Sequence, residues 1–169
     1  MKQNRLNGIK SYAAGLFLGG IVFFLAACNS TTNSIDEWRQ NNDDAYNQIK
    51  KNTEWALIST PQGPTGVYRQ IVVNGTGEEH PYQTASVTVN YTGRYYNGTV
   101  FDSGTSATFN VNGVVRGFDV ALQNMVVGDK WNICIPYYLG YGTTTYGSIQ
   151  AYTTLFFEVE LLKINQYPN

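Results

Sequence analysis

From Val67 to Ile164 the chain alternates short apolar stretches with glycine and asparagine turns, and this pattern constrains the fold more than any other feature. Residues 87–92 alternate apolar and polar side chains, which is typical of a strand with one buried face. Asn97-Gly98 predicts a hairpin with a type I′ turn, in which both turn positions need a positive φ. Residues 154–164 form the longest and most hydrophobic of the expected strands, so we expect this strand at the centre of a sheet. Residues 117–125 predict one short helix between the strands, with apolar side chains at helical spacing.

The sequence therefore favours an α+β fold, an antiparallel sheet of five to six strands wrapped on one short helix. The composition agrees, because 43% of the 169 residues are hydrophobic, 14% are charged, and glycine (17) and tyrosine (13) are frequent. A net charge of −1 argues against a general polyanion-binding surface. With one His and two Cys, the chain has almost no ligands for a soft-metal site, so we expect no metal.

The first 28 residues are typical of an export signal. Three basic residues precede an apolar stretch, residues 13–27, which is too short to cross a bilayer that takes about 20 residues. The stretch ends in Leu25-Ala26-Ala27-Cys28, which resembles the lipobox of bacterial lipoproteins. This resemblance implies a signal peptide at residues 1–27, a lipidated Cys28 and a chain held in the bacterial cell envelope by its lipid anchor.

Cleavage before Cys28 would remove three basic residues and no acidic one, leaving 8 Lys plus Arg against 12 Asp plus Glu and a net charge of −4. Nucleic acid is therefore excluded as an expected partner. With Cys28 lipidated, Cys134 has no disulfide partner, and its strand-like surroundings predict a buried, inert thiol.

The N-terminal part of the processed chain is predicted as a polar tether (28–34), a helical segment (35–58) and a linker (59–66) that leads into the main domain (67–166). Ser34 has N-cap character, and Ile35, Trp38, Ala45 and Ile49 recur at roughly helical spacing over residues 35–51. This apolar stripe would either pack on the domain or mediate a dimer through the helix.

Six segments in order carry a resemblance to a known family: Val87–Gly93, Asn97–Ser103, Val114–Phe118, Met125–Gly128, Ile135-Pro136 with Tyr141-Gly142, and Thr154–Leu162. Together they resemble the FKBP family of peptidyl-prolyl cis-trans isomerases from Gly66 to Ile164. The resemblance implies an FKBP-like fold with a hydrophobic pocket between helix and sheet. It also implies the pocket residues, namely catalytic Tyr91, Phe101, Asp102 and Tyr141, and substrate-binding Val114, Val115, Phe118, Ile149 and Phe157.

The resemblance assigns distinct roles to several of these residues. Phe118 would form the pocket floor, the backbone N–H of Val115 would receive a substrate carbonyl, and the Tyr141 hydroxyl would donate to another. Residues 140–153 would form the lip of the pocket. Asp102 would orient donors or interact with the rotating carbonyl carbon, and as a buried carboxylate it should have hydrogen-bond partners.

Rotation of an X-Pro amide crosses about 18 to 20 kcal/mol without making a bond, so it needs no nucleophile, metal or cofactor. An apolar cleft would disfavour the polar planar amide and hold the prolyl ring while the preceding carbonyl rotates. The expected partners are proline-containing polypeptides, and also macrolides of the FK and rapamycin type.

Three places depart from the family's usual pattern. One is Ala107, where some relatives have a pocket aromatic, although many bacterial relatives also lack it. Most relatives have Trp at the floor, whereas Phe118 has less area and no indole N–H, which puts ligand affinity in question more than catalysis. The lip reads Ile149-Gln150-Ala151 where Ile-Pro-Pro is usual, and a softer lip would change substrate preference or lower activity. Two alternatives to an isomerase follow: a non-catalytic chaperone or peptide-binding lipoprotein on the same fold, and a structural or adhesive surface lipoprotein.

Overall fold

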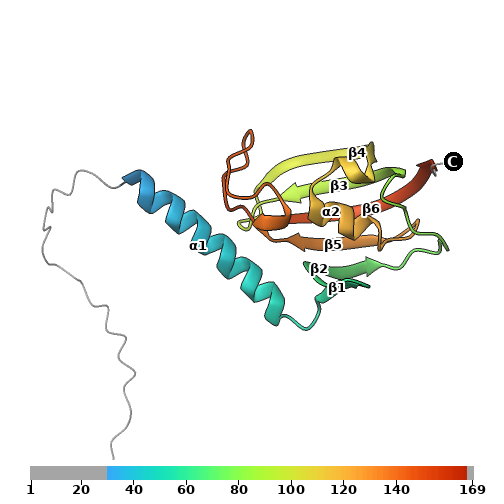
Figure 1. Cartoon of the computed structure of the whole chain (residues 1–169), viewed down its shortest axis with the longest axis horizontal. Coiled ribbons are helices and arrows are strands. Elements are labelled where there is room, and N and C mark those ends of the chain that lie inside the picture. The colour runs from blue at the N-terminus through green and yellow to red at the C-terminus, as the bar shows by residue number, and fades with distance from the viewer. Residues whose placement is uncertain (1–29, 167–169) are drawn as a thin grey trace, which may run out of the picture.

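The structure, a computed structural model, describes residues 30–166 and the side chains of residues 34–165 (Figure 1). The predicted signal peptide and Cys28 lie outside the described residues. The elements in chain order are α1 (Ser30–Lys51), β1 (Ala56–Thr60), β2 (Gly63–Val73), β3 (Ser86–Arg94), β4 (Val100–Asn110), a 3-10 turn (Val111–Gly113), α2 (Arg116–Leu122), β5 (Lys130–Ile135), a second 3-10 turn (Tyr137–Leu139) and β6 (Leu155–Gln166).

The six strands form one antiparallel sheet in the order β1-β2-β5-β6-β3-β4. This confirms the predicted fold class, including the N-terminal helix. The predicted central position of the last strand is also confirmed, because β6 lies between β5 and β3. Its buried side chains Val159 and Leu161 alternate with more exposed residues, as a strand with one covered face requires.

The short helix α2 lies across one face of the sheet and covers the core (Figure 1). Gly117 permits this close packing, because a Cβ there would collide with the side chain of Ile135 in β5. The helix ends at Leu122, three residues before the predicted end at Met125. The last turn tightens instead, since Asn124 and Met125 donate to Ala121 and Leu122 in three-residue steps.

The β3–β4 hairpin forms at the predicted place, but its turn is not of type I′. Within the described residues only Ser106 and Tyr152 combine a positive φ with a side chain, so Asn97 does not have the required conformation. Of the two turn residues, only Gly98 has a left-handed conformation, with a φ of 85°. Gly98 donates its N–H to the carbonyl of Tyr95, and Tyr95 donates to that of Thr99. These bonds are typical of a type I turn followed by a left-handed glycine, which satisfies the hairpin with one positive φ.

The prediction of a linker at residues 59–66 is wrong, and so is the prediction that the helical segment continues to residue 58. Residues 56–73 form the β1–β2 hairpin, in which Thr60 pairs with Gly63 across Pro61 and Gln62. The proline and glycine therefore mark a tight turn within the sheet, with Gly63 at φ 117°. As a result, the sheet begins at Ala56 rather than at Val67.

The tether prediction is also wrong over residues 30–33, because α1 already begins at Ser30 and not after Ser34. These residues include no proline or glycine that would stop the helix from extending toward the N-terminus. In the part of the chain described here, no helix combines the length and apolarity needed to cross a membrane.

Helix α1 packs along one end of the domain, beside the long loop before β6 (Figure 1). Its contacts come from Trp38, Asn42 and Tyr46, which are spaced four residues apart. Of the predicted apolar stripe, only Trp38 belongs to this contact row, and Ile35 is 39% exposed. The helix is therefore held by hydrogen bonds together with the rings of Trp38 and Tyr46, and the Ile35 end of the predicted stripe stays exposed.

Candidate active site

A pocket of about 270 Å³ opens between α2, the sheet and the loop before β6. Ten residues line it: Tyr91, Asp102, Phe109, Gly113, Val114, Val115, Phe118, Tyr141, Tyr146 and Phe157. They come from β3, β4, the approach to α2, α2 itself, the loop and β6. The wall is mainly aromatic, so the pocket suits an apolar ring.

The aromatic walls are held by edge-to-face packing. Phe118 is 3% exposed, and its ring centre lies 5.0 Å from that of Phe157 and 6.5 Å from that of Tyr91. Phe109 packs edge-on against Tyr91 at 5.4 Å. Gly93 leaves room for this arrangement, because a Cβ there would approach the rings of both Phe101 and Phe157 to within 2.6–2.7 Å. The structure thus places Phe118 at the base of the pocket, where the floor was expected.

The principal polar pair of the pocket joins Tyr91 and Asp102. The Tyr91 hydroxyl donates to Asp102 Oδ2 at 2.8 Å, and the backbone N–H of Ser103 donates to Asp102 Oδ1 at 2.9 Å. Burial, together with the bond to Asp102 and its charge, raises the pKa of Tyr91 to about 12. Asp102 has the expected partners, but the prediction that it is buried is wrong, because its side chain is exposed at the rim of the edge strand β4.

Val115 presents a backbone donor at the pocket wall. Its carbonyl accepts the N–H groups of Phe118 and Asp119 and so starts α2. The described part of the chain supplies no acceptor for the N–H of Val115 itself. This group is therefore available to a ligand that enters the pocket.

The lip, residues 140–153, supplies Tyr141 and Tyr146. Their rings stack at 4.9 Å with an interplanar angle of 12°. Burial is the main cause that raises the pKa of Tyr141, and the neighbouring Tyr146 and Asp102 act in the same direction. The Tyr141 hydroxyl therefore stays protonated and able to donate a hydrogen bond.

Seven of the nine residues that the resemblance implied meet in this pocket: Tyr91, Asp102, Val114, Val115, Phe118, Tyr141 and Phe157. The other two lie behind its walls. Phe101 packs against Phe157 at 5.4 Å, and Ile149 is 7% exposed and bridges to Tyr146 within the lip.

Sequence reasoning missed Phe109, Gly113 and Tyr146 as lining residues. Phe109 is half-buried in β4 between the exposed residues Thr108 and Asn110, so strand alternation places it on the covered face and would have identified it. Tyr146 is 67% exposed, but its stacking on Tyr141 brings it to the pocket.

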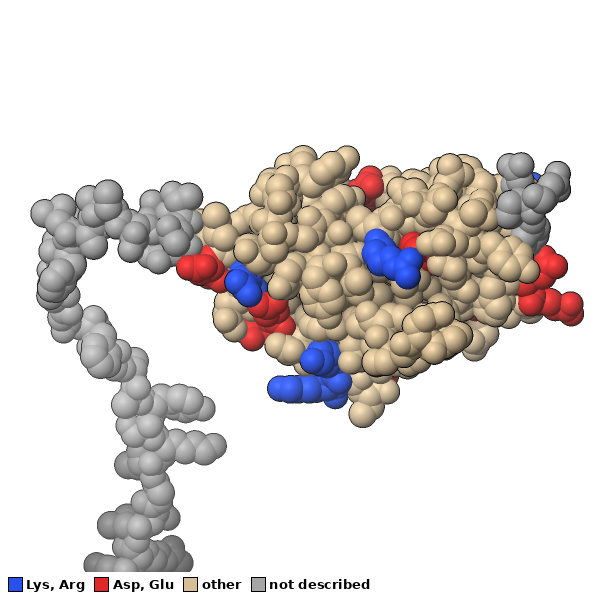
Figure 2. Space-filling model, in the orientation of Figure 1, with Lys and Arg blue, Asp and Glu red and all other residues tan. Residues whose placement is uncertain are grey.

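A larger hollow of about 470 Å³ lies between the β1–β2 turn and α2, but it has a mixed polar lining without aromatic rings. Within the described residues, no group of three or more His, Cys, Asp or Glu could hold a metal ion. On the face shown in Figure 2, charged side chains form a few small, separate groups of both signs. The aromatic pocket is therefore the strongest candidate site.

The comparisons with known proteins match the part of the chain that contains this pocket. A family model described as FKBP-type peptidyl-prolyl cis-trans isomerase matches residues 77–162. A curated relative from Escherichia coli strain K12, named FKBP-type 22 kDa peptidyl-prolyl cis-trans isomerase, is 46% identical over 105 residues, covering 59% of this chain and 50% of the relative. The outer membrane protein MIP of Legionella longbeachae is 39% identical over 108 residues, covering 61% of this chain and 46% of the relative.

A solved structure of a peptidyl-prolyl cis-trans isomerase from Pseudomonas syringae pv. tomato superimposes with a TM-score of 0.69 at 28% identity. The match covers 83% of this chain and 100% of that one. The chain spans about half the length of the curated relatives described above.

Proposed function

Because the chain belongs to the FKBP-type peptidyl-prolyl cis-trans isomerase family, we propose that it accelerates the rotation of X-Pro bonds in polypeptides. The observation that carries this proposal is the aromatic pocket of about 270 Å³, which is lined by Val115, whose backbone N–H has no acceptor among the described residues, and by Tyr141. Such a space accepts a prolyl ring and leaves the amide before it within reach of the donors.

The proposed mechanism uses binding alone. The prolyl ring lies on Phe118, and the N–H of Val115 and the hydroxyl of Tyr141 each donate to a substrate carbonyl that flanks the rotating bond. These contacts fix the chain on either side, so the intervening amide is free to turn. Apolar walls disfavour the polar planar amide relative to the less polar twisted one, which lowers the barrier of about 18 to 20 kcal/mol.

Asp102 has a fixed orientation in this scheme. Tyr91 and the N–H of Ser103 hold its two carboxylate oxygens, so the group cannot turn away from the pocket. Its charge at the rim would interact with the carbonyl carbon as the amide leaves planarity. Tyr91 therefore orients Asp102, while its ring also forms part of the wall.

The test is exchange of a short X-Pro peptide between its cis and trans forms, followed by NMR line broadening with and without the protein. Acceleration supports the isomerase. Binding without acceleration would instead favour a non-catalytic chaperone, which the smaller ring of Phe118 and the exposed Tyr138 and Tyr146, at 57% and 67%, also suit. Macrolides of the FK and rapamycin type should compete with the peptide for the pocket.

We also propose that the chain acts in the bacterial cell envelope, with residues 1–27 removed and Cys28 lipidated. The support is the lipobox-like sequence and the name of the Legionella relative, which places that relative in the outer membrane. The substrates would then be exported, proline-containing proteins. Metabolic labelling with palmitate should mark the chain and not Cys28→Ser, and label retained by that variant would contradict the anchor.

A dimer through α1 would use the part of the helix that the domain leaves uncovered, including Ile35. Sedimentation of the processed chain tests this alternative, because a monomer at micromolar concentration contradicts it.

A further inference from the structure

We propose that helix α1 positions the lip of the pocket, and that Asn42 and Trp38 are positioning residues for the isomerase reaction. This inference rests on the proposed function and assigns part of it to residues outside the matched family region, which begins at residue 77. The relevant contacts join α1 to the last residues of the lip and to the β3–β4 hairpin.

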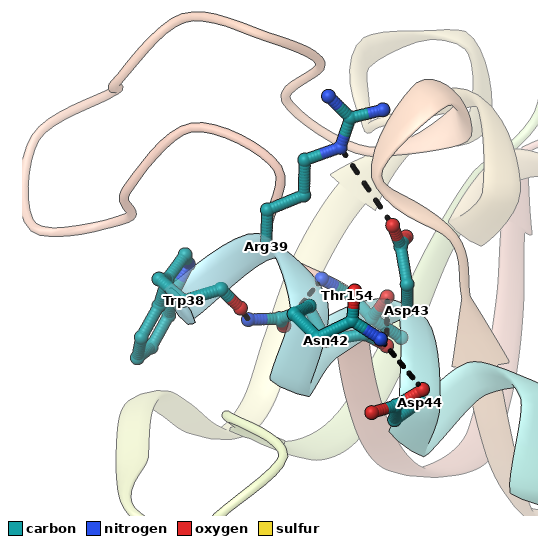
Figure 3. A network of polar contacts seen from close by, with 7 residues as sticks. Trp38, Arg39, Asn42, Asp43, Asp44 and Thr154 are labelled. Atoms are coloured by element: carbon teal, nitrogen blue, oxygen red, sulfur yellow. Dashed lines mark hydrogen bonds and ion pairs between the residues drawn. The ribbon is translucent and has the colours of Figure 1, made fainter. Parts of the chain in front are cut away.

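Asn42 is the centre of these contacts and is fully buried. Thr154, the residue directly after the lip, donates its backbone N–H to Asn42 Oδ1 at 2.8 Å and its hydroxyl to the Asn42 carbonyl at 3.2 Å. The Asn42 amide nitrogen donates to the carbonyl of Trp38 at 2.8 Å (Figure 3). A buried amide that is satisfied in this one geometry fixes the register of the helix against the start of β6.

Two neighbouring side chains of α1 hold the preceding lip residues. Trp38 donates its indole N–H to Thr153 Oγ1 at 3.1 Å, and that hydroxyl donates to the carbonyl of Gln150 at 2.6 Å. The guanidinium of Arg39 lies 4.7 Å from the ring centre of Tyr152. Tyr152 has a φ of 64°, a left-handed conformation that a bulky residue adopts only when its surroundings impose it.

The helix also reaches the other side of the lip through Tyr95. The rings of Trp38 and Tyr95 pack edge-on at 5.6 Å, and the Tyr95 hydroxyl donates to the carbonyl of Ser148 at 2.8 Å. The Tyr95 ring in turn packs at 5.1 Å on Phe101, which lies behind the pocket wall. Trp38 therefore contacts both the end of the lip and the residue that holds its middle.

These contacts lead directly to the reacting groups. Tyr152 donates its N–H to the carbonyl of Gly142 at 2.9 Å and so closes the lip beside Tyr141. Thr154 is followed by β6, which carries Phe157 into the pocket. Residues 140–153 of the lip contain no proline that would stiffen the backbone. The contacts with α1 therefore hold the lip in place. This matters for catalysis because a displacement of the lip would move the hydroxyl of Tyr141 away from the substrate carbonyl.

The test compares two full-length variants that each remove one asparagine amide from α1. Asn42→Ala removes the buried group, and Asn47→Ala removes an exposed one on the same helix. For Asn42→Ala we expect kcat/KM for an X-Pro peptide to fall about tenfold, and backbone amide resonances of residues 141–153 to broaden. Asn47→Ala should match the parent chain in both measurements.

Retained activity in Asn42→Ala would overturn the proposal. So would a loss of activity that follows only the unfolded fraction, with unchanged lip resonances in the folded molecules. If Asn42→Ala does not fold, Trp38→Phe is the second test, since it keeps a smaller ring beside Tyr95 and removes the donor to Thr153. We expect about a threefold loss of kcat/KM and broadening of the same lip resonances. Should the parent chain itself not accelerate exchange, the proposed function fails, whereas broadening of the lip in Asn42→Ala would still show the positioning.

Discussion

The aromatic pocket and the junction between α1 and the lip are neighbouring regions held together by different forces. In the pocket, rings of Tyr91, Phe118 and Phe157 pack edge to face, with few polar contacts at the rim. At the junction, a buried asparagine and an indole N–H make directional hydrogen bonds to consecutive residues, Thr153 and Thr154. Packing of rings is tolerant of small changes, whereas an unmade buried hydrogen bond is not.

Because of this difference, we expect substitutions in the pocket to change mainly the activity and substitutions at the junction to change mainly the stability. The polar side chains that we place in the reaction lie at an exposed rim or on the lip, so their removal leaves the core intact. The polar groups of the junction are buried, so their removal leaves a backbone donor without a partner. The predictions below test whether the two regions respond in these two distinct ways.

The largest expected effect is on activity in the pocket. Asp102→Ala combined with Tyr141→Phe removes the rim carboxylate and one substrate donor, and we expect kcat/KM for X-Pro exchange to fall about a hundredfold. The melting temperature should change by no more than about 2 °C, because Asp102 is exposed and the Tyr141 ring stays.

The control is Asp36→Ala, which removes an exposed carboxylate from α1. It should leave both turnover and melting temperature at the parent values. Unaltered turnover in the pocket double variant would show that the reacting groups lie elsewhere.

The second effect is on stability at the junction. Asn42→Ala leaves the buried N–H of Thr154 without its acceptor, so the free energy of unfolding should fall by about 2 kcal/mol. Urea unfolding measures the change, and Asn47→Ala should stay within about 0.5 kcal/mol of the parent. Equal stabilities would mean that the helix is docked by its rings alone, and the contrast between the two regions would disappear.

The same contrast explains what the sequence could predict. Strand alternation and glycine turns gave the sheet and its central strand, because burial of one face is a local, periodic signal. The resemblance placed seven residues in the pocket because each follows a recognisable short motif. Phe101 and Ile149 belong to the same motifs but turn behind the wall, a distinction that depends on tertiary packing.

No periodic pattern or short motif in the sequence indicates the contacts between α1 and the lip. Asn42 and Thr154 are 112 residues apart, and an asparagine next to Asp43 and Asp44 in a helix has the composition of a solvent-facing row. Periodicity therefore selected Ile35, whereas the buried position is Asn42. Likewise, Pro61 and Gly63 could end a domain or turn a hairpin, and only pairing across the sheet decides between them.

The third prediction concerns pH. Folding raises the pKa of Tyr91 from its ordinary value of 10.0 to about 12, so folding favours the neutral phenol. Its contribution to stability is therefore complete below pH 10 and is lost as the pH rises from 10 through 12. Burial raises the pKa of Tyr46 at the α1 end still further, so its contribution is fully lost only at higher pH. Urea unfolding at pH 8, 10 and 11 should show a smaller loss of stability in Tyr91→Phe than in the parent chain.

The comparison for this prediction is the parent chain, unfolded in urea at the same three pH values. If Tyr91→Phe also follows the parent curve, the bond to Asp102 and the burial of the phenol do not favour the neutral form, and the polar rim is looser than the geometry indicates.

The smallest expected effect is a change of the pocket floor. Phe118→Trp enlarges the apolar base and adds an indole N–H, so a macrolide of the FK or rapamycin type should bind about threefold more tightly. Phe118→Leu, which removes the ring, should weaken binding, and titration followed by intrinsic fluorescence or calorimetry measures both.

The ring of Phe118 is 3% exposed and packs on Phe157, so a larger ring must displace its neighbour slightly. A gain in affinity would show that the pocket accommodates this shift, as tolerant ring packing implies. Equal or weaker binding would show either that Phe118 is not the floor of the pocket or that ring packing in the pocket tolerates change no better than the hydrogen bonds of the junction.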